Sequence, residues 1–104
     1  MINMNKKDLA KIVAENEEIP VTEALDRVDS VLLAIVEANA KLAEGEPEGK
    51  KAIRGKLTLV GFGSFIVRDI PERTYRNPKS GGNVVKPRRN EASFKPGKAL
   101  EESV

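Results

Sequence analysis

The sequence predicts an α+β fold in one domain, residues 1–104, with helices first and strands afterwards. Apolar residues recur at three- and four-residue intervals between Leu9 and Leu42, which is typical of amphipathic helices. From Leu57 onward apolar and polar residues alternate, as they do in half-buried strands. Further on, two extended segments rich in Lys and Arg flank a Pro/Gly turn, which indicates a basic β-ribbon.

The helical body is expected over residues 4–44. Asn5 can cap a first helix, and Asp8 three residues later completes a capping-box-like pair. This helix is expected to end near Asn16.

A second helix is expected to begin near Pro20 and to run to about Ala43, with Gly45 after it as a stop signal. Its apolar stripe is wide, because it continues through Leu33 and Val36, and a short neighbouring helix cannot cover it. A chain of 104 residues also has little room for a large private core. We therefore expect a partner subunit to cover the remainder.

Residues 45–55 are expected to form an extended loop, since they combine glycine, proline and charge without an apolar period. A solvated spacer is the favoured interpretation, and a contact site peculiar to this protein is the alternative. The sheet and arm are expected over residues 56–95, starting with a hairpin that turns at Gly61 and Gly63.

Two prolines predict that the ribbon projects as an arm. Pro71 and Pro87 lie about equally far from the turn near Lys79, so they should sit roughly opposite one another. Proline lacks a ladder donor and is confined to edge strands, bulges or strand starts. Both strands of a detached ribbon are edges, and an isolated ribbon is only marginally stable. We expect an arm that is mobile when free and ordered on its ligand.

The composition argues against an enzyme. The chain has no cysteine and no histidine, which removes disulfides, zinc sites of the Cys/His kind and the commonest general base. We expect no catalytic residue, no metal and no cofactor. The Gly61-x-Gly63 pair lacks the third glycine of a nucleotide fingerprint, because residue 66 is isoleucine. No signal or membrane span is evident, so a soluble intracellular protein is expected.

Charge is segregated along the chain. Residues 1–52 carry seven Lys/Arg and eleven Asp/Glu, a net charge of −4, whereas residues 53–104 carry eleven and five, a net charge of +6. Between Arg68 and Lys98 nine cations face three acids. A solvated charged surface is the simpler explanation, but this asymmetry favours a basic surface turned toward a polyanion such as DNA.

Four short motifs in order resemble the bacterial HU and integration host factor proteins, the small dimeric DNA-bending class. The likeness needs no gap between Gly61 and Leu100. The motifs are Met4-Asn5-Lys6, Gly61-Phe62-Gly63-Ser64-Phe65, Arg76-Asn77-Pro78 and Phe94-Lys95-Pro96-Gly97-Lys98-Ala99-Leu100.

The resemblance implies a three-stranded antiparallel sheet that extends into the arm, a short C-terminal helix over residues 97–104, and an intertwined dimer. It implies a histone-like protein that binds double-stranded DNA with little sequence specificity and bends it. The partners would be DNA and a second copy of the chain, or a paralogue in a heterodimer, with no membrane. The location would be the nucleoid in the cytoplasm, whether the source is a cell or a virus.

The resemblance also implies site roles. Pro78 would insert between base pairs, although an ordinary turn proline is the simpler alternative. The minor-groove arm would comprise Arg73, Arg76, Asn77 and Lys79. Phosphate contacts would come from Lys6, Gly61, Gly63, Arg68, Lys86, Arg88, Arg89 and Lys98. The aromatic core between subunits would comprise Phe62, Phe65 and Phe94.

The chain departs from the usual family pattern, and two rival functions stay open. The loop after the second helix is longer than expected, Ile70 replaces a common arginine, Glu91 replaces an apolar residue, and three residues precede Met4. One rival is a site-specific regulator or recombination cofactor of the integration-host-factor type, which reads DNA shape. The other is a scaffold whose arm grips an acidic protein.

Overall fold

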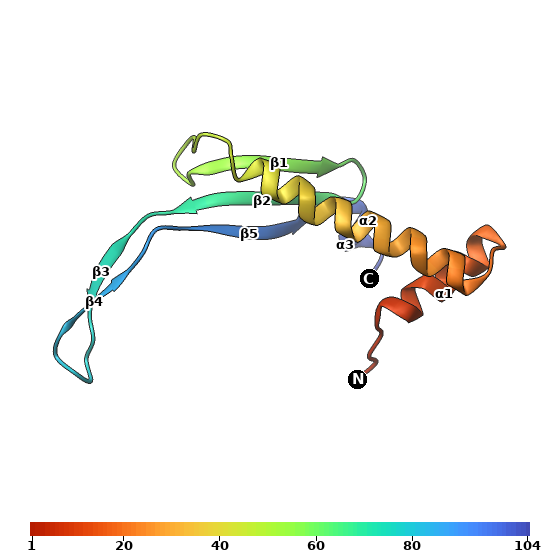
Figure 1. Ribbon diagram of the computed structural model, residues 1–104, viewed down its shortest axis with the longest axis horizontal. Helices are drawn as coiled ribbons and strands as arrows, with labels where there is room; N and C mark the ends of the chain where they lie inside the picture. Colours follow the sequence, from red (N-terminus) through yellow and green to blue (C-terminus); the bar gives the residue numbers. More distant parts are fainter. The chain divides into compact units, whose positions relative to one another are not determined.

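A computed structural model describes residues 1–104 and confirms the α+β fold (Figure 1). The chain divides into two compact units, residues 1–37 and residues 38–104. The first unit contains one helix and most of a second. The second unit contains the rest of that helix, a three-stranded sheet, a two-stranded arm and a short C-terminal helix.

Helix α1 spans Lys6–Glu17 and begins with the expected capping box. The Asp8 backbone N–H donates to Asn5 Oδ1 at 3.0 Å, and the Asn5 backbone N–H donates to Asp8 Oδ2 at 2.9 Å. The helix ends one residue beyond the expected Asn16, because Glu18 turns the chain with a left-handed φ of 55°.

Helix α2 spans Val21–Leu42, close to its expected bounds. It packs on α1 through small side chains, and the buried residues of this core are Ala10, Ala14, Ala24 and Val28. A wide apolar face of α2 remains uncovered by the chain itself, since Leu33 and Val36 keep 60% and 65% of their surface exposed. The predicted width of the stripe is therefore confirmed.

The sheet is antiparallel with the strand order β1-β2-β5. Its strands are β1 at Ile53–Leu59, β2 at Gly63–Ile70 and β5 at Arg89–Pro96. The first strand begins at residue 53, three residues before the expected start at residue 56, because Ile53 already pairs with Arg68. After a register shift between Ile53 and Gly55, the pairing runs to Leu59 opposite Gly63.

The segment between α2 and β1 is exposed at most of its residues and contains a small closed turn. Glu48 and Ile53 exchange backbone hydrogen bonds of 3.0 and 3.1 Å, which closes a small turn. Ala52 adopts a left-handed φ of 51° inside it. The Ala52 carbonyl accepts a 2.8 Å bond from the Asp69 backbone N–H, so the segment is joined to β2.

The arm consists of β3 at Arg73–Arg76 and β4 at Asn83–Lys86, which pair only with each other. Pairing of β2 with β5 ends at Ile70 opposite Arg89, and arm pairing begins at Arg73 opposite Lys86. Pro71 and Pro87 occupy the intervening segments, roughly opposite each other as predicted. The chain changes direction there, and the arm leaves the sheet (Figure 1).

Helix α3 spans Lys98–Glu102 and is shorter than the expected range 97–104. Gly97 is its N-cap, and Ser103 lies beyond its last turn. No helix of the chain combines the length and the apolar character that crossing a membrane requires.

Candidate nucleic-acid interface

The two faces of the three-stranded sheet differ in chemistry. Side chains alternate between faces along a strand, and residues directly opposite one another share a face. The face that contains Val67 also contains Phe65 and Asp69, and it includes the buried positions of β2. The other face is polar and basic, with residues Lys56, Thr58, Ser64, Ile66, Arg68, Ile70, Arg89, Glu91, Ser93 and Lys95.

The basic face continues into a groove at the root of the arm. This groove has a volume of ≈ 260 Å³. It brings together four of the predicted phosphate-contact and arm residues, while Glu91 is the one acid beside them. Glu91 lies 4.0 Å from Arg68 and 3.7 Å from Arg89, too far for strong pairing. The four cations are Arg68, Arg73, Lys86 and Arg89.

Sequence reasoning missed two cations of the basic face. Lys56 on β1 and Lys95 on β5 are exposed, and neither takes part in an ion pair within 4.0 Å. Their register places them on the same face as Arg68. The alternation along β1 could have revealed Lys56, but the pairing of β5 with β2 was needed to place Lys95.

The structure separates Arg88 from the other predicted phosphate contacts. Its Nε donates to Asp69 Oδ1 at 2.7 Å, and its Nη2 donates to Asp69 Oδ2 at 3.1 Å. Asp69 belongs to the face opposite Arg68, so this bidentate pair turns the guanidinium away from the basic groove. The sequence does suggest Asp69 as a salt-bridge partner, but only the fold selects Arg88 for it.

The arm tip is a compact turn that exposes Pro78. The Asn77 backbone N–H donates to Gly82 O, and the Gly81 N–H donates to Asn77 O, both at 2.9 Å. Asn77 Oδ1 accepts a 2.9 Å bond from the Lys79 backbone N–H, which is an Asx turn. Asn77 thus shapes the tip with its oxygen, and its amide nitrogen keeps two donors.

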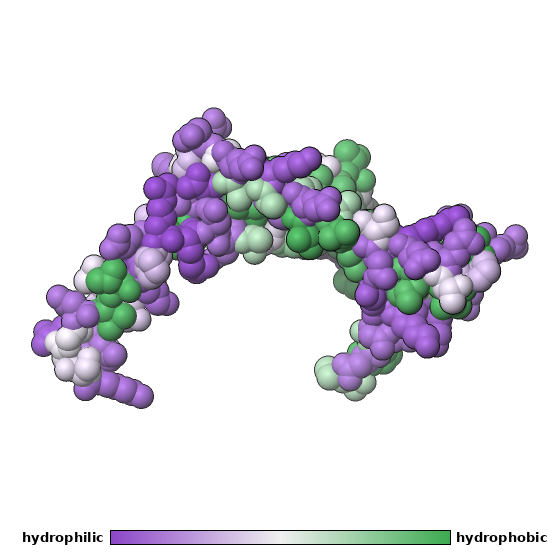
Figure 2. Space-filling model, in the orientation of Figure 1, coloured by the Kyte–Doolittle hydropathy of each residue, from purple (hydrophilic) through white to green (hydrophobic).

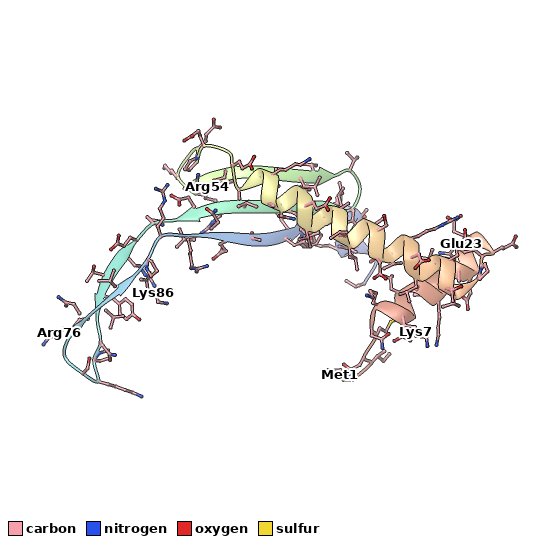
Figure 3. The ribbon with its side chains drawn as sticks, viewed as in Figure 1. Met1, Lys7, Glu23, Arg54, Arg76 and Lys86 are labelled. Atoms are coloured by element: carbon pink, nitrogen blue, oxygen red, sulfur yellow. The ribbon has the colours of Figure 1, made fainter.

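The arm has hydrophilic regions and one hydrophobic patch midway along its length (Figure 2). Arg76 lies near the tip and Lys86 near the root (Figure 3). Lys86 Nζ lies 5.8 Å from the centre of the Tyr75 ring, a cation–π contact across the ribbon. Arg73, Arg76 and Lys79 form no ion pair within 4.0 Å and keep their cationic charge unpaired.

The remaining predicted phosphate contacts differ in how available they are. Lys98 is 89% exposed, with Glu102 at 3.8 Å, whereas Lys6 Nζ is 2.6 Å from Asp29. Gly61 lies in an exposed turn with a φ of 81°, which favours glycine and leaves its backbone open. Gly63 is buried, and a side chain there would collide with the Phe94 ring. Gly63 therefore serves packing.

The three phenylalanines form one aromatic cluster. The ring centres of Phe65 and Phe94 are 4.9 Å apart, and those of Phe62 and Phe94 are 5.6 Å apart. Phe62 and Phe94 remain 47% and 38% exposed. The cluster is thus assembled within one chain and keeps an open apolar side.

Comparisons with known proteins agree with this basic interface. The sequence profile of a family described as "Bacterial DNA-binding protein" matches residues 4–104. DNA-binding protein HU-1 of Halalkalibacterium halodurans is 42% identical over 101 residues, which cover 97% of this chain and 99% of that protein. DNA-binding protein HU 1 of Bacillus subtilis is 39% identical, with 97% of each chain covered. An Anabaena HU–DNA cocrystal structure has a TM-score of 0.72 at 33% identity and covers 96% of both chains.

Proposed function

The chain belongs to the bacterial DNA-binding protein family that includes the HU proteins, and from this we propose that it is a histone-like architectural protein. It binds double-stranded DNA as a dimer and bends it, with little dependence on sequence. The observation that carries this proposal is the basic groove from which a detached, cationic arm with an exposed proline extends.

The groove and the polar sheet face supply phosphate contacts. Cations on the surface can replace the counterions condensed on DNA, which makes the affinity strongly dependent on salt. Such contacts position the protein without reading bases. We assign this role to Lys56, Arg68, Arg73, Lys86, Arg89, Lys95 and Lys98, with weaker contributions from Lys6 and the Gly61 backbone.

The arm tip is assigned to the minor groove. Arg76 and the Asn77 amide nitrogen are donors, and the minor-groove floor offers acceptors at both A·T and T·A pairs. Pro78 acts as a wedge, because a rigid apolar ring without a backbone donor can separate stacked bases without leaving an unpaired N–H. Opening a base step costs a few kcal/mol, and the ion pairs with phosphate that form as the DNA wraps offset this cost.

Two apolar surfaces support the dimer. The α2 face that includes Leu32, Leu33 and Val36 is exposed in the single chain, and so are parts of Phe62 and Phe94. Exposed apolar surface of this extent marks an interface in an otherwise hydrophilic protein. A second copy buries these surfaces and provides the second arm.

The comparisons favour the architectural role over a site-specific regulator, because the relatives named above are HU proteins. The protein therefore belongs in the nucleoid. Direct base readout is confined to the degenerate minor groove, so discrimination between duplexes depends on their flexibility. We expect tighter binding to nicked or pre-bent duplexes than to linear ones.

One titration tests the proposal. Purified protein is added to linear, nicked and pre-bent duplexes of equal length at several salt concentrations, while complex mass and end-to-end distance are recorded. Two chains per complex, a steep salt dependence and shortened ends are the expected results. A single chain per complex, or ends that stay at the length of free DNA, would overturn it.

A further inference from the structure

The root of the arm contains an ion cluster that DNA binding does not explain. Asp69 accepts hydrogen bonds from two guanidinium groups, those of Arg54 at 3.2 Å and Arg88 at 2.7 and 3.1 Å. The cluster lies on the sheet face opposite the basic groove. Asp69 engages both guanidinium groups and joins residues that are far apart in the chain, so we seek the role of the cluster within the fold.

Arg54 connects this cluster to the segment that precedes β1. Its Nη1 donates to the Gly45 carbonyl at 3.0 Å, and its Nε donates to Asn90 Oδ1 at 2.9 Å. The Arg54 and Asp69 side chains are only 16% and 10% exposed. Gly45 packs so closely on the Arg54 backbone that a side chain there would collide with the Arg54 carbonyl. Residues 45–52 are thus a closed loop tied to the sheet through Arg54.

The same cluster holds both strands where they enter the arm. Asp69 lies two residues before Pro71 on β2, and Arg88 lies one residue after Pro87 on the returning strand. Arg54 lies at the end of the sheet from which the arm leaves (Figure 3). Beyond the prolines the arm strands pair only with each other. The cluster therefore joins the two strands beside the last backbone pair of the sheet, Ile70 opposite Arg89.

We propose that Asp69 is a positioning residue which, through Arg54 and Arg88, uses loop 45–52 as a brace to fix the direction of the arm. The proposal rests on the proposed function, because it gives the brace a consequence for DNA bending. Motion of the arm is concentrated at the segments that contain Pro71 and Pro87. The brace keeps the adjoining ends of β2 and β5 from rotating together with the arm.

A small change of direction at the root has a large effect at the tip. Seven residues separate Pro71 from Pro78, or about 23 Å at the rise of an extended strand. A rotation of about 10° would move the tip by about 4 Å, which exceeds the spacing of about 3.4 Å between successive bases along a strand. A loose root would therefore let the wedge enter at neighbouring steps and spread the bend angle.

The test measures the arm without DNA, so its result does not depend on the proposed function. The chain has no native cysteine, so Ser80→Cys and Ser93→Cys accept spin labels at the arm tip and on β5. Labelled chain is mixed with excess unlabelled chain, and the distance distribution between the labels is recorded. We expect Arg88→Met to broaden this distribution, and a rotation of about 10° at the root would broaden it by about 4 Å.

Control variants separate positioning from folding. Arg88 is 60% exposed, so its replacement leaves the buried Arg54 and Asp69 pair in place. Arg88→Lys keeps the charge but loses the bidentate geometry. Its distribution of label distances should therefore be narrower than that of Arg88→Met and broader than that of the wild type. Glu72→Gln removes an exposed carboxylate beside Pro71 that has no ion-pair partner within 4.0 Å, and should change nothing.

The same variants then bind a duplex labelled at both ends for energy transfer. Arg88→Met should widen the distribution of end-to-end distances, and Glu72→Gln should leave it as in the wild type. An unchanged label distribution in both Arg88→Met and Asp69→Asn, at retained helix content, would refute the brace. Failure of the wild type to bind DNA would refute the proposed function and leave the brace result standing.

Discussion

At the scale of single residues, the fold places chemically similar side chains in different roles. Arg88 and Arg89 are neighbours in the sequence, yet one pairs with Asp69 and the other lines the basic groove. The alternation of faces along an extended chain causes this division. Counting the cations of the sequence cannot separate these two roles, whereas the structure shows that Arg88 does not line the basic groove.

The stability of the fold should depend on pH through the ionisation of Asp69. The hydrogen bond from Arg88, helped by Arg54, lowers the pKa of Asp69 below its ordinary 3.8, against the opposing effect of burial. A carboxylate with a depressed pKa stabilises the fold at neutral pH, and this contribution is lost as pH falls through the folded pKa. Glu46 adds a further negative charge near Arg88. We expect the urea midpoints of wild type and Asp69→Asn to differ above about pH 5 and to converge below 3.8.

Glu72→Gln provides the comparison, since Glu72 has no ion pair within 4.0 Å. Its urea midpoint should follow the wild type at every pH. A gap between wild type and Asp69→Asn that stays constant down to the lowest pH would contradict the role assigned to the carboxylate.

Replacing Pro78 tests whether this residue inserts between base pairs. Replacement by Ala removes the rigid ring but leaves the exposed tip turn, which depends on Asn77 and Gly82. We expect Pro78→Ala to reduce bending more than binding, because the phosphate contacts lie elsewhere on the arm and sheet. Energy transfer between the duplex ends reports the DNA bend angle. A bend angle equal to that of the wild type at saturating protein would contradict the proposed insertion of Pro78.

At the scale of elements, the sheet face assigns Lys56 and Lys95 to DNA. In the dimer the double variant Lys56→Ala/Lys95→Ala removes four lysines, so we expect it to flatten the plot of log affinity against log salt by about 3.6, or about 0.9 for each phosphate that is no longer neutralised. Lys50→Ala, on the loop before β1, should leave the slope unchanged. Equal slopes for the wild type and the double variant would show that the sheet face does not contact phosphate.

The arm is the element whose behaviour should change most on binding. Its two four-residue strands have no third strand or helix against them, and such ribbons are marginally stable in water. We expect amide protection in residues 73–86 to be weak in the free protein and to rise on DNA. Protection in β2 should be high in both states, and equal arm protection with and without DNA would contradict the expected ordering.

At the scale of the whole molecule, the apolar face of α2 predicts that the dimer is essential. Val36→Glu places a charge on a face that a second copy must bury, and an unpaired buried charge costs several kcal/mol. We expect this variant to be monomeric or unfolded at micromolar concentration in sedimentation equilibrium. Glu37→Gln, on the neighbouring exposed position, should remain dimeric.

The sequence by itself determined the helices, the arm and the chemistry of its tip. Local signals suffice for these features: a capping box at Asn5, a wide apolar stripe in α2, and prolines that only a detached ribbon tolerates. Only the tertiary structure decided which cations reach the groove, that loop 45–52 closes on Arg54, and that Arg88 binds Asp69. These features depend on strand register and on contacts between residues that are distant in sequence. Neither produces a periodic pattern in the sequence.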